Sequence, residues 1–425
     1  MSQSLAAPAT FAPAAPAHNR AAGRVCIGRV EVFGDPASAS KAWSMLEAQA
    51  PVSPYQTQAW VLPWLATIGA ARSMRGLVSV AYDTLGEPVG LLPLCITNRG
   101  PLRLAEFPGG KDANFTFGLI APGANLTAED LRYWLAQTAR HAPERIDLFA
   151  LVNQPESWNG VANPLLALGG QKGPAQGYRT ALLGDAGAFI KSKMSGESRK
   201  KIRAKERRLA ELGTLSYVTA RDAPMARRIL AAFAAQKAQR MQDKGIHNCF
   251  ADPAAEAFLE RGALDFGNQG CGGIELHALL AAERIIATFG GATHQGRFCG
   301  MFNSFDLDPL VTRNSPGDLL LAWLIQQKCR EGLHGFDLGV GAARYKETWC
   351  TEIEPMFDVY VPVNVLGRGM AAVKAGKRRL KGHIKASLRL WALVERLRKL
   401  RRQRRILPAG SGLGPPASGR REAQC

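Results

Sequence analysis

Residues 313–324 read RNSPGDLLLAWL and contain the signals of a helix start. Ser315 has a side chain that often caps helices, Pro316 suits the first helical position, and Asp318 can complete a capping box. The segment that follows is apolar on most sides, so we expect a buried helix that ends near Gly332.

Predicted strands lie on both sides of this helix, at residues 297–306 and 335–339. Strand, helix and strand form a βαβ unit, whose right-handed crossover places the helix N-terminus at the carboxyl end of the first strand. Free N–H groups and the helix dipole favour an anion there. The sequence therefore predicts a phosphate-binding loop, and a helix cap that binds nothing is the alternative. The loop consists of Arg313, Asn314, Ser315, Pro316 and Gly317.

The chain is basic, and its charge is concentrated near the C-terminus. Its 425 residues suffice for two or three domains, and 46% of them are hydrophobic, as in globular proteins. Lys and Arg number 54 against 35 Asp and Glu, which gives a net charge of +19. Residues 366–405 hold 15 of these cations and one acid, Glu395, so +14 of the net charge lies there. A polyanion, an anionic membrane surface or an anionic cofactor is a candidate partner.

The eight cysteines form no C-x-x-C pair, so we expect neither a metal site nor a disulfide framework. This use of cysteine fits a reducing compartment, so we expect a cytoplasmic protein. Residues 1–24 are rich in Ala and Pro and are expected to form a disordered leader rather than a secretory signal. There is no run of about 18 apolar residues, so no membrane-spanning helix is predicted.

Mixed α and β patterns divide the chain into two units, at residues 25–184 and 185–363. In the first unit we expect strands at 25–34, 77–97 (a hairpin) and 145–152, and helices at 37–49, 54–70 and 126–140. In the second we expect helices at 196–213, 223–241 and 254–265, a three-stranded meander at 273–281, 284–294 and 297–306, and a last strand at 357–363.

Two basic helices leave alternatives open. The helix at 196–213 carries Arg199 and Lys200 and is either a solvated surface helix or a ligand-binding one. Residues 364–406 are predicted to form a basic amphipathic helix, which either lies on an anionic membrane or partner or packs on its own domain. Residues 407–425 are expected to be a disordered tail.

The order of elements and several short motifs together resemble one enzyme family. Residues 54–60 (PYQTQAW), 92–94 (LPL), 198–200 (SRK), 313–317 (RNSPG) and 337–349 are similar to the CelD-like acetyltransferases of the GNAT type, first linked to cellulose biosynthesis. That family is related in fold to the Fem-type aminoacyl transferases, which carry two GNAT-like halves. The resemblance implies an α+β or α/β fold with a degenerate N-terminal GNAT half, a catalytic C-terminal half and the basic C-terminal helix.

The resemblance also implies an acyl-CoA donor, acetyl-CoA above all, and an amine or hydroxyl acceptor. Such acyl transfer needs a donor held by its phosphates, a base, charge stabilisation on the thioester oxygen and an acid for the thiolate. The phosphate loop departs from the usual pattern, Gln/Arg-x-x-Gly-x-Gly/Ala, because Pro316 and Asp318 stand where glycines are usual.

Individual roles follow as hypotheses, each with a structural alternative. Asp337 and His294 are the candidate bases, although Asp337 could instead pair with Lys346 and His294 could be an ordinary loop residue. Tyr345 is the candidate acid, or a packed aromatic residue. Lys346, Arg199 and Lys200 are the candidate substrate-binding residues.

Three functions remain open at this stage. The first is an acyl-CoA-dependent acyltransferase, acting in exopolysaccharide, cellulose or envelope biosynthesis, cytoplasmic and peripheral at the inner membrane. The second is a Fem-like transferase that uses aminoacyl-tRNA, with the basic helices holding phosphates. The third is a non-catalytic protein that binds a membrane or a nucleic acid.

Overall fold

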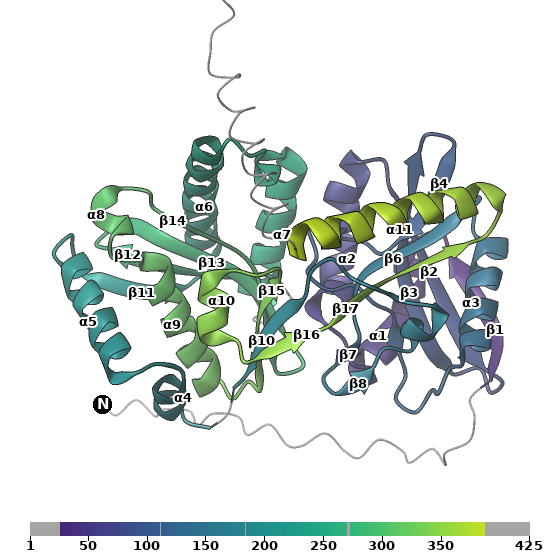
Figure 1. Cartoon of the computed structure of the whole chain (residues 1–425), viewed down its shortest axis with the longest axis horizontal. Helices are drawn as coiled ribbons and strands as arrows, with labels where there is room; N and C mark the ends of the chain where they lie inside the picture. Colours follow the sequence, from purple (N-terminus) through teal and green to yellow (C-terminus); the bar gives the residue numbers. More distant parts are fainter. Residues whose placement is uncertain (1–25, 111, 183, 270–272, 387–425) are drawn as a thin grey trace, which may run out of the picture.

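The computed structural model describes residues 26–110, 112–182, 184–269 and 273–386. Two mixed sheets lie side by side, each with helices against its faces (Figure 1). This confirms the predicted fold class.

The first sheet has the strand order β1-β2-β3-β4-β6-β17-β9, with β5 beside β3. Helices α1 and α2 cover one face and α3 the other. The predicted hairpin is confirmed as the antiparallel pair β2 and β3. The bounds of these elements are β1 Ile27–Phe33, β2 Arg75–Asp83, β3 Pro88–Arg99, β4 Leu102–Glu106, β5 Leu119–Ile120, β6 Leu148–Pro155, β9 Gln171–Lys172, β17 Met356–Pro362, α1 Ser40–Gln49, α2 Gln58–Trp64 and α3 Ala128–His141.

The second sheet has the order β11-β12-β13-β14-β15-β10-β16, which includes the predicted meander β12 to β14. Helices α6 and α7 pack on one face, and α9 packs on the other through its leucines. The bounds are β10 Gly177–Ala181, β11 Leu215–Thr219, β12 Glu275–Ala281, β13 Arg284–His294, β14 Arg297–Phe305, β15 Gly335–Val340, β16 Glu352–Glu354, α4 Ala186–Lys193, α5 Gly196–Ala210, α6 Ala223–Lys244, α7 Pro253–Gln269, α8 Pro309–Thr312, α9 Pro316–Arg330 and α10 Arg344–Trp349.

The two sheets exchange strands across the division expected from the sequence. Strand β10 precedes residue 184 but pairs with β15 and β16 in the second sheet. Strand β17, expected to end the second unit, pairs with β6 and β9 in the first sheet. The sheets therefore do not divide at residues 184 and 363, because a strand joins the sheet whose edge it can pair with. A small hairpin of β7 (Ser157–Trp158) and β8 (Val161–Ala162) lies between β6 and β9 along the chain.

The final described helix, α11 (Val365–Ala386), packs along β17 and β6 (Figure 1). Met370 and Ala371 contact a small apolar cluster of the first sheet, on the face that α1 and α2 also cover. Of the two alternatives for the basic helix, packing on its own domain is thus observed for its first turns. The rest of the predicted helix, from residue 387, the tail 407–425 and the leader 1–24 lie outside the described residues.

Candidate active site

We call each sheet together with its helices a domain. A split between two parallel strands forms the centre of the second domain. Strands β14 and β15 pair only where Arg297, Phe298 and Cys299 face Gly335, Phe336 and Asp337. Both strands continue beyond this ladder, β14 to Phe305 and β15 to Val340. We call the region beyond the last pair, between residues 300–305 and 338–340, the split. Helix α9 follows β14 and α10 follows β15, so both helices begin near this region.

A side chain from the first domain bridges the two strands where the ladder ends. Asn114 donates from Nδ2 to the carbonyl oxygen of Gly300 (3.0 Å) and accepts at Oδ1 from the amide of Val340 (3.2 Å). Its Nδ2 also lies 2.7 Å from the hydroxyl of Tyr55. Gly339 has φ of +73°, and a Cβ there would lie 2.6 Å from the Asn114 amide. The bridge therefore needs both an asparagine at 114 and a glycine at 339.

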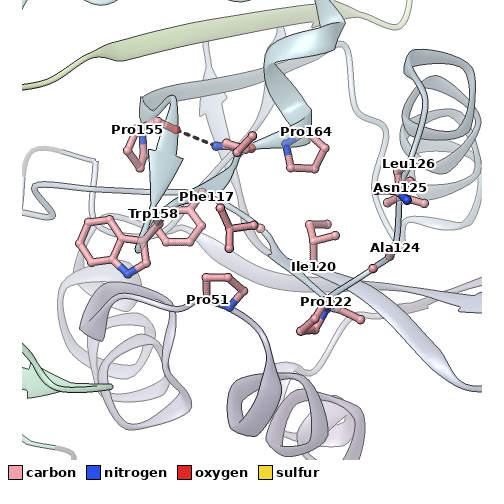
Figure 2. A pocket seen from close by; sticks show the side chains of 16 residues that line it. Pro51, Phe117, Ile120, Pro122, Ala124, Asn125, Leu126, Pro155, Trp158 and Pro164 are labelled. Atoms are coloured by element: carbon pink, nitrogen blue, oxygen red, sulfur yellow. Dashed lines mark hydrogen bonds between the residues drawn. The ribbon is translucent and has the colours of Figure 1, made fainter. Parts of the chain in front are cut away.

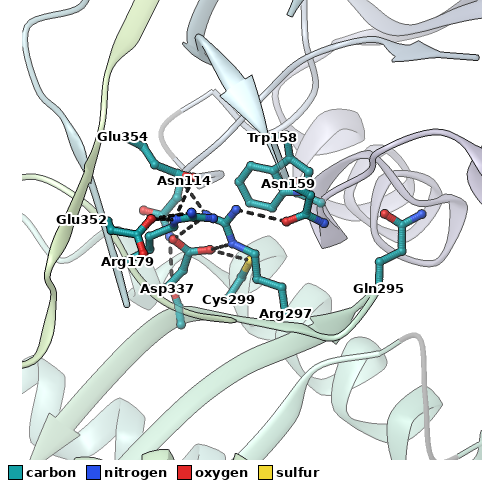
Figure 3. A network of polar contacts seen from close by, with 12 residues as sticks. Asn114, Trp158, Asn159, Arg179, Gln295, Arg297, Cys299, Asp337, Glu352 and Glu354 are labelled. Carbon is teal, nitrogen blue, oxygen red and sulfur yellow. Dashed lines mark hydrogen bonds and ion pairs between the residues drawn. The ribbon is translucent and has the colours of Figure 1, made fainter. Parts of the chain in front are cut away.

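Below the split lies a buried ionic network (Figure 3). Arg297 donates to both oxygens of Asp337 and to Glu354 (2.7 Å), and its guanidinium lies 3.6 Å from the ring centre of Trp158. Arg297 is 1% exposed and Asp337 0% exposed. Burial, followed by the charge of Asp337, raises the pKa of Glu354 to about 7, although Arg297 opposes this shift. Arg297 thus serves two buried carboxyl groups, and a second cation, Arg179, lies 3.7 Å from Glu354.

The alternative prediction, that Asp337 pairs with Lys346, is wrong. Asp337 pairs with Arg297, whereas Lys346 donates to the carbonyl oxygens of Gly339 (3.1 Å) and Val340 (3.2 Å). Burial lowers the pKa of Lys346 to about 8. Lys346 therefore holds the end of β15 through its carbonyl groups.

Tyr345, the candidate acid, lies on α10 and faces β14 across the split. Burial raises the pKa of Tyr345, and a side-chain hydrogen bond with Asn303 of β14 partly opposes the shift. The carbonyl oxygen of Asn303 in turn accepts from Lys237 of α6 (3.2 Å). A tyrosine whose pKa is raised keeps its proton near neutral pH, as a general acid must.

The predicted capping box at the start of α9 was wrong. Ser315 adopts a left-handed conformation, with φ of 50°, and its side chain does not cap the helix. Instead its hydroxyl accepts from Nζ of Lys205 on the basic helix α5 (2.9 Å). Partial burial raises the pKa of Asp318, opposed by the charges of Lys205 and Arg344.

Most backbone amides of the loop before α9 already donate hydrogen bonds within local turns. Those of Arg313, Asn314, Ser315, Asp318 and Leu319 donate to backbone carbonyls. Since Pro316 has no N–H, Gly317 provides the remaining amide of the turn. The Asn314 side chain is 1% exposed, and its Oδ1 has no hydrogen-bond partner among the described residues. The groups that this loop offers to an anion are therefore mainly two cations, Arg313 and Lys205, and not a row of free amides.

The structure does not bring the remaining predicted site residues to the split. His294 ends β13 opposite Arg297, about 20 Å along β14 from Asn303 at the usual rise per residue. Its ring is half-buried, and burial lowers its pKa. Arg199 donates to the carbonyl oxygen of Met194 (2.7 Å), and Lys200 is exposed on the same helix.

Two cavities lie in or beside the first domain. The larger, about 530 Å³, has walls that include Gly109, Gly110 and Thr116, from the loop that also carries Asn114. The α6–α7 loop forms another wall, and its Phe250 packs on Phe302 of β14, with ring centres 6.1 Å apart.

The smaller cavity, about 420 Å³, is lined by prolines and apolar side chains around Trp158 (Figure 2). None of its lining residues is charged, and Trp158 connects it to the ionic network through Arg297.

The sequence did not predict that Asn114, Lys205 and Arg297 belong to this site. Asn114 and Arg297 have no local motif, because their partners lie 186 and 57 residues away in the chain. Lys205 was visible as one cation among many on α5, and only its contact with Ser315 distinguishes it.

No group of three or more His, Cys, Asp or Glu among the described residues is arranged to hold a metal ion. No helix of the described ranges is long and apolar enough to cross a membrane.

Comparisons with known proteins agree with this architecture. Residues 196–347, which include the split and the loop before α9, match the family model described as "Acetyltransferase (GNAT) domain". The structure of FemX is similar over 81% of this chain and 99% of that chain, with a TM-score of 0.56 and 11% identity. The fold is therefore the tandem GNAT-like fold, as the resemblance implied.

Two further solved structures show a weaker likeness. The structure of L-PGS from Bacillus licheniformis has a TM-score of 0.47 and 13% identity, over 82% of this chain and 98% of that one. A tandem GNAT protein from the clavulanic acid biosynthesis pathway has a TM-score of 0.42 and 11% identity, over 79% and 99%. Among curated protein sequences, none matches this chain.

Proposed function

We propose that this protein is an acyltransferase that moves an acyl group from acyl-CoA to an amine or hydroxyl acceptor. The observation that carries the proposal is the split, with the cationic loop before α9 at the end of one strand and Tyr345 facing the other. The family match over residues 196–347 supports the donor class.

In this proposal the donor lies along the split. Arg313 and Lys205 hold its phosphates by charge, and the Gly317 amide contributes a hydrogen bond. The side chain of Asp318 stays near Lys205 and Arg344, so it does not repel the phosphates alone. The thioester carbonyl meets a backbone amide of β14 between residues 302 and 305.

The reaction itself needs two proton movements. The acceptor nucleophile attacks the thioester carbon and loses a proton, and the leaving thiolate gains one. We assign the second movement to Tyr345. Asp337 does not act as a free base in this proposal, because Arg297 occupies both of its oxygens. An amine that arrives already neutral gives its proton to solvent after attack.

We place the acceptor in the larger cavity. Two of its walls are segments that also contact β14 at residues 300–302. Arg99 lines it together with Trp64 and Phe107, whereas Arg72 is paired with Asp112 (3.0 Å), so an acceptor with an anionic group near Arg99 and a flat or apolar portion fits these walls. Exopolysaccharide, cellulose or envelope assembly remains the proposed setting.

The test is a calorimetric and thermal-shift titration with acetyl-CoA and longer acyl-CoAs. Binding to the folded state stabilises it by mass action, so micromolar binding gives a measurable shift. The variant Lys205→Met should weaken binding about tenfold, since it loses one charged contact worth roughly 1.4 kcal/mol. Lys201→Met is the matched control, because Lys201 lies one turn earlier on α5 and is paired with Glu197 on the surface. No shift with any acyl-CoA would reject the donor.

A transferase that uses aminoacyl-tRNA is the second candidate, favoured by one observation. Helix α5, whose Lys205 contacts the loop before α9, exposes several further cations toward solvent. These are Lys200, Lys201, Arg203, Arg207 and Arg208. If tRNA is the donor, it should bind with a steep salt dependence, and replacing these cations should reduce the slope. Binding of acyl-CoA but not tRNA would remove this candidate.

A further inference from the structure

Helix α11 has one apolar face packed on the first sheet. Its backbone lies so close to the sheet that a Cβ at Gly367 would fall 1.8 Å from the carbonyl oxygen of Asp147. Met370 and Ala371 pack on the cluster of Leu104, Leu148 and Ala150, and Ala375 is buried. This face fixes the helix flat along the domain (Figure 1).

The opposite face of α11 is also apolar, but it is exposed. Leu366, Val373 and Leu380 are 54%, 50% and 60% exposed. They are seven residues apart, so they align along the helix at two-turn intervals. Exposed Gly369 and Gly376 lie between them on the same side. We call Leu366, Gly369, Val373, Gly376 and Leu380 the outer stripe.

Basic residues border the outer stripe. At 100° per residue, exposed Arg368 and Arg379 lie on one side of it and exposed Lys377 on the other. The helix has seven Lys and Arg and no Asp or Glu. A helix with an exposed apolar stripe between cations has the composition of helices that lie in the interface of an anionic bilayer.

We propose that the outer stripe of α11 docks this protein on an anionic lipid bilayer. A nucleic acid would use the cations but leave the leucines and valine in water. A second copy of the chain would cover the stripe but would bring two acid-free, basic helices together. A bilayer accounts for both the apolar stripe and the cations, because its acyl chains contact the stripe and its anionic headgroups contact the cations.

Docking would also orient the larger cavity. Lys374 of α11 pairs with Glu106 (2.8 Å), and Glu106 lines that cavity. The docked helix therefore holds the cavity beside the membrane surface. This consequence is independent of whether the donor is acyl-CoA.

The test is co-sedimentation of the full-length protein with vesicles of phosphatidylcholine, alone or mixed with phosphatidylglycerol. We expect binding to the mixed vesicles only. The triple variant L366Q/V373Q/L380Q should bind at least about tenfold more weakly, because it removes the three exposed apolar side chains that docking would bury in the bilayer. The variant L85Q is the matched control, since Leu85 is 84% exposed on a turn far from α11 in sequence, and it should bind like wild type.

A second triple variant, R368Q/K377Q/R379Q, should lower both the affinity and its salt dependence. Thermal unfolding of each variant checks that the fold is retained. The proposal is overturned if wild type does not sediment with mixed vesicles, or if L366Q/V373Q/L380Q binds them undiminished, since residues 387–425 are present in both proteins. It is also overturned if that variant abolishes a dimer that wild type forms in solution without lipid.

Discussion

Asn114, in the first domain, accepts a hydrogen bond from the backbone amide of Val340, in the second domain, at 3.2 Å. The same side chain donates to Gly300 on the neighbouring strand, so it replaces the strand pairing that ends at Cys299 and Asp337. The first domain thus contributes a structural part of the site, which the idea of a degenerate N-terminal half did not anticipate.

The variant Asn114→Ala should affect both stability and donor binding. Loss of the bridge leaves a buried carbonyl and a buried amide without partners, which costs about 1–3 kcal/mol of unfolding free energy. Donor affinity should fall about tenfold as the split loses its fixed width. Urea denaturation and acyl-CoA titration measure the two effects. The exposed Asn98→Ala serves as control, and equal behaviour of the two variants would contradict the role of the bridge.

The variant Arg297→Met should be strongly destabilising. It leaves Asp337 buried without its cation and Glu354 with only Arg179, 3.7 Å away, and breaking a buried pair in this way typically costs about 3–5 kcal/mol. Arg284→Met is a matched control, because Arg284 also pairs with two carboxylates, Asp306 and Asp308, but is 50% exposed. The control should cost less than about 1 kcal/mol by denaturation. Similar costs for both variants would show that burial of the network is unimportant.

Glu354 should make stability fall as pH rises from about 5 to about 7. Its pKa is raised to about 7 in the folded protein, against 4.5 as the ordinary value, so between these pH values the folded state holds a proton that the unfolded state has lost. Stability therefore decreases with pH in this window, by roughly 3 kcal/mol at most. Glu354→Gln should remove this part of the slope in denaturation curves from pH 4 to 8. An unchanged slope would mean that another group titrates.

The variant Tyr345→Phe should lower kcat roughly 100-fold with little change in donor affinity, because only the phenolic proton is lost. Because burial raises the pKa of Tyr345, the rate of wild type should not decline below pH 10 through this group. A pH–rate profile and a donor titration measure these effects. Tyr133→Phe, on the exposed side of α3, is the control. Undiminished kcat in Tyr345→Phe would remove this residue from the mechanism.

Local patterns in the sequence determined most of the elements and the class of fold. The alternation in β12 to β14, the apolar run in α9 and the hairpin of β2 and β3 depend on neighbours in the chain, and all were predicted. The sequence also pointed to Tyr345, in the segment directly after β15, and its role as the acid stays a prediction.

Only the tertiary structure decided which residues meet. The exchange of β10 and β17 between the sheets depends on which strand edges are free after folding, a property that no local pattern encodes. The pairing of Asp337 with Arg297 rather than Lys346 is similar, because the charges select partners by distance in space and not in sequence. Ser315 has the chemistry of a helix cap, yet Lys205 reaches its hydroxyl from another helix and its backbone is left-handed, so the local preference yields to the contacts made on folding.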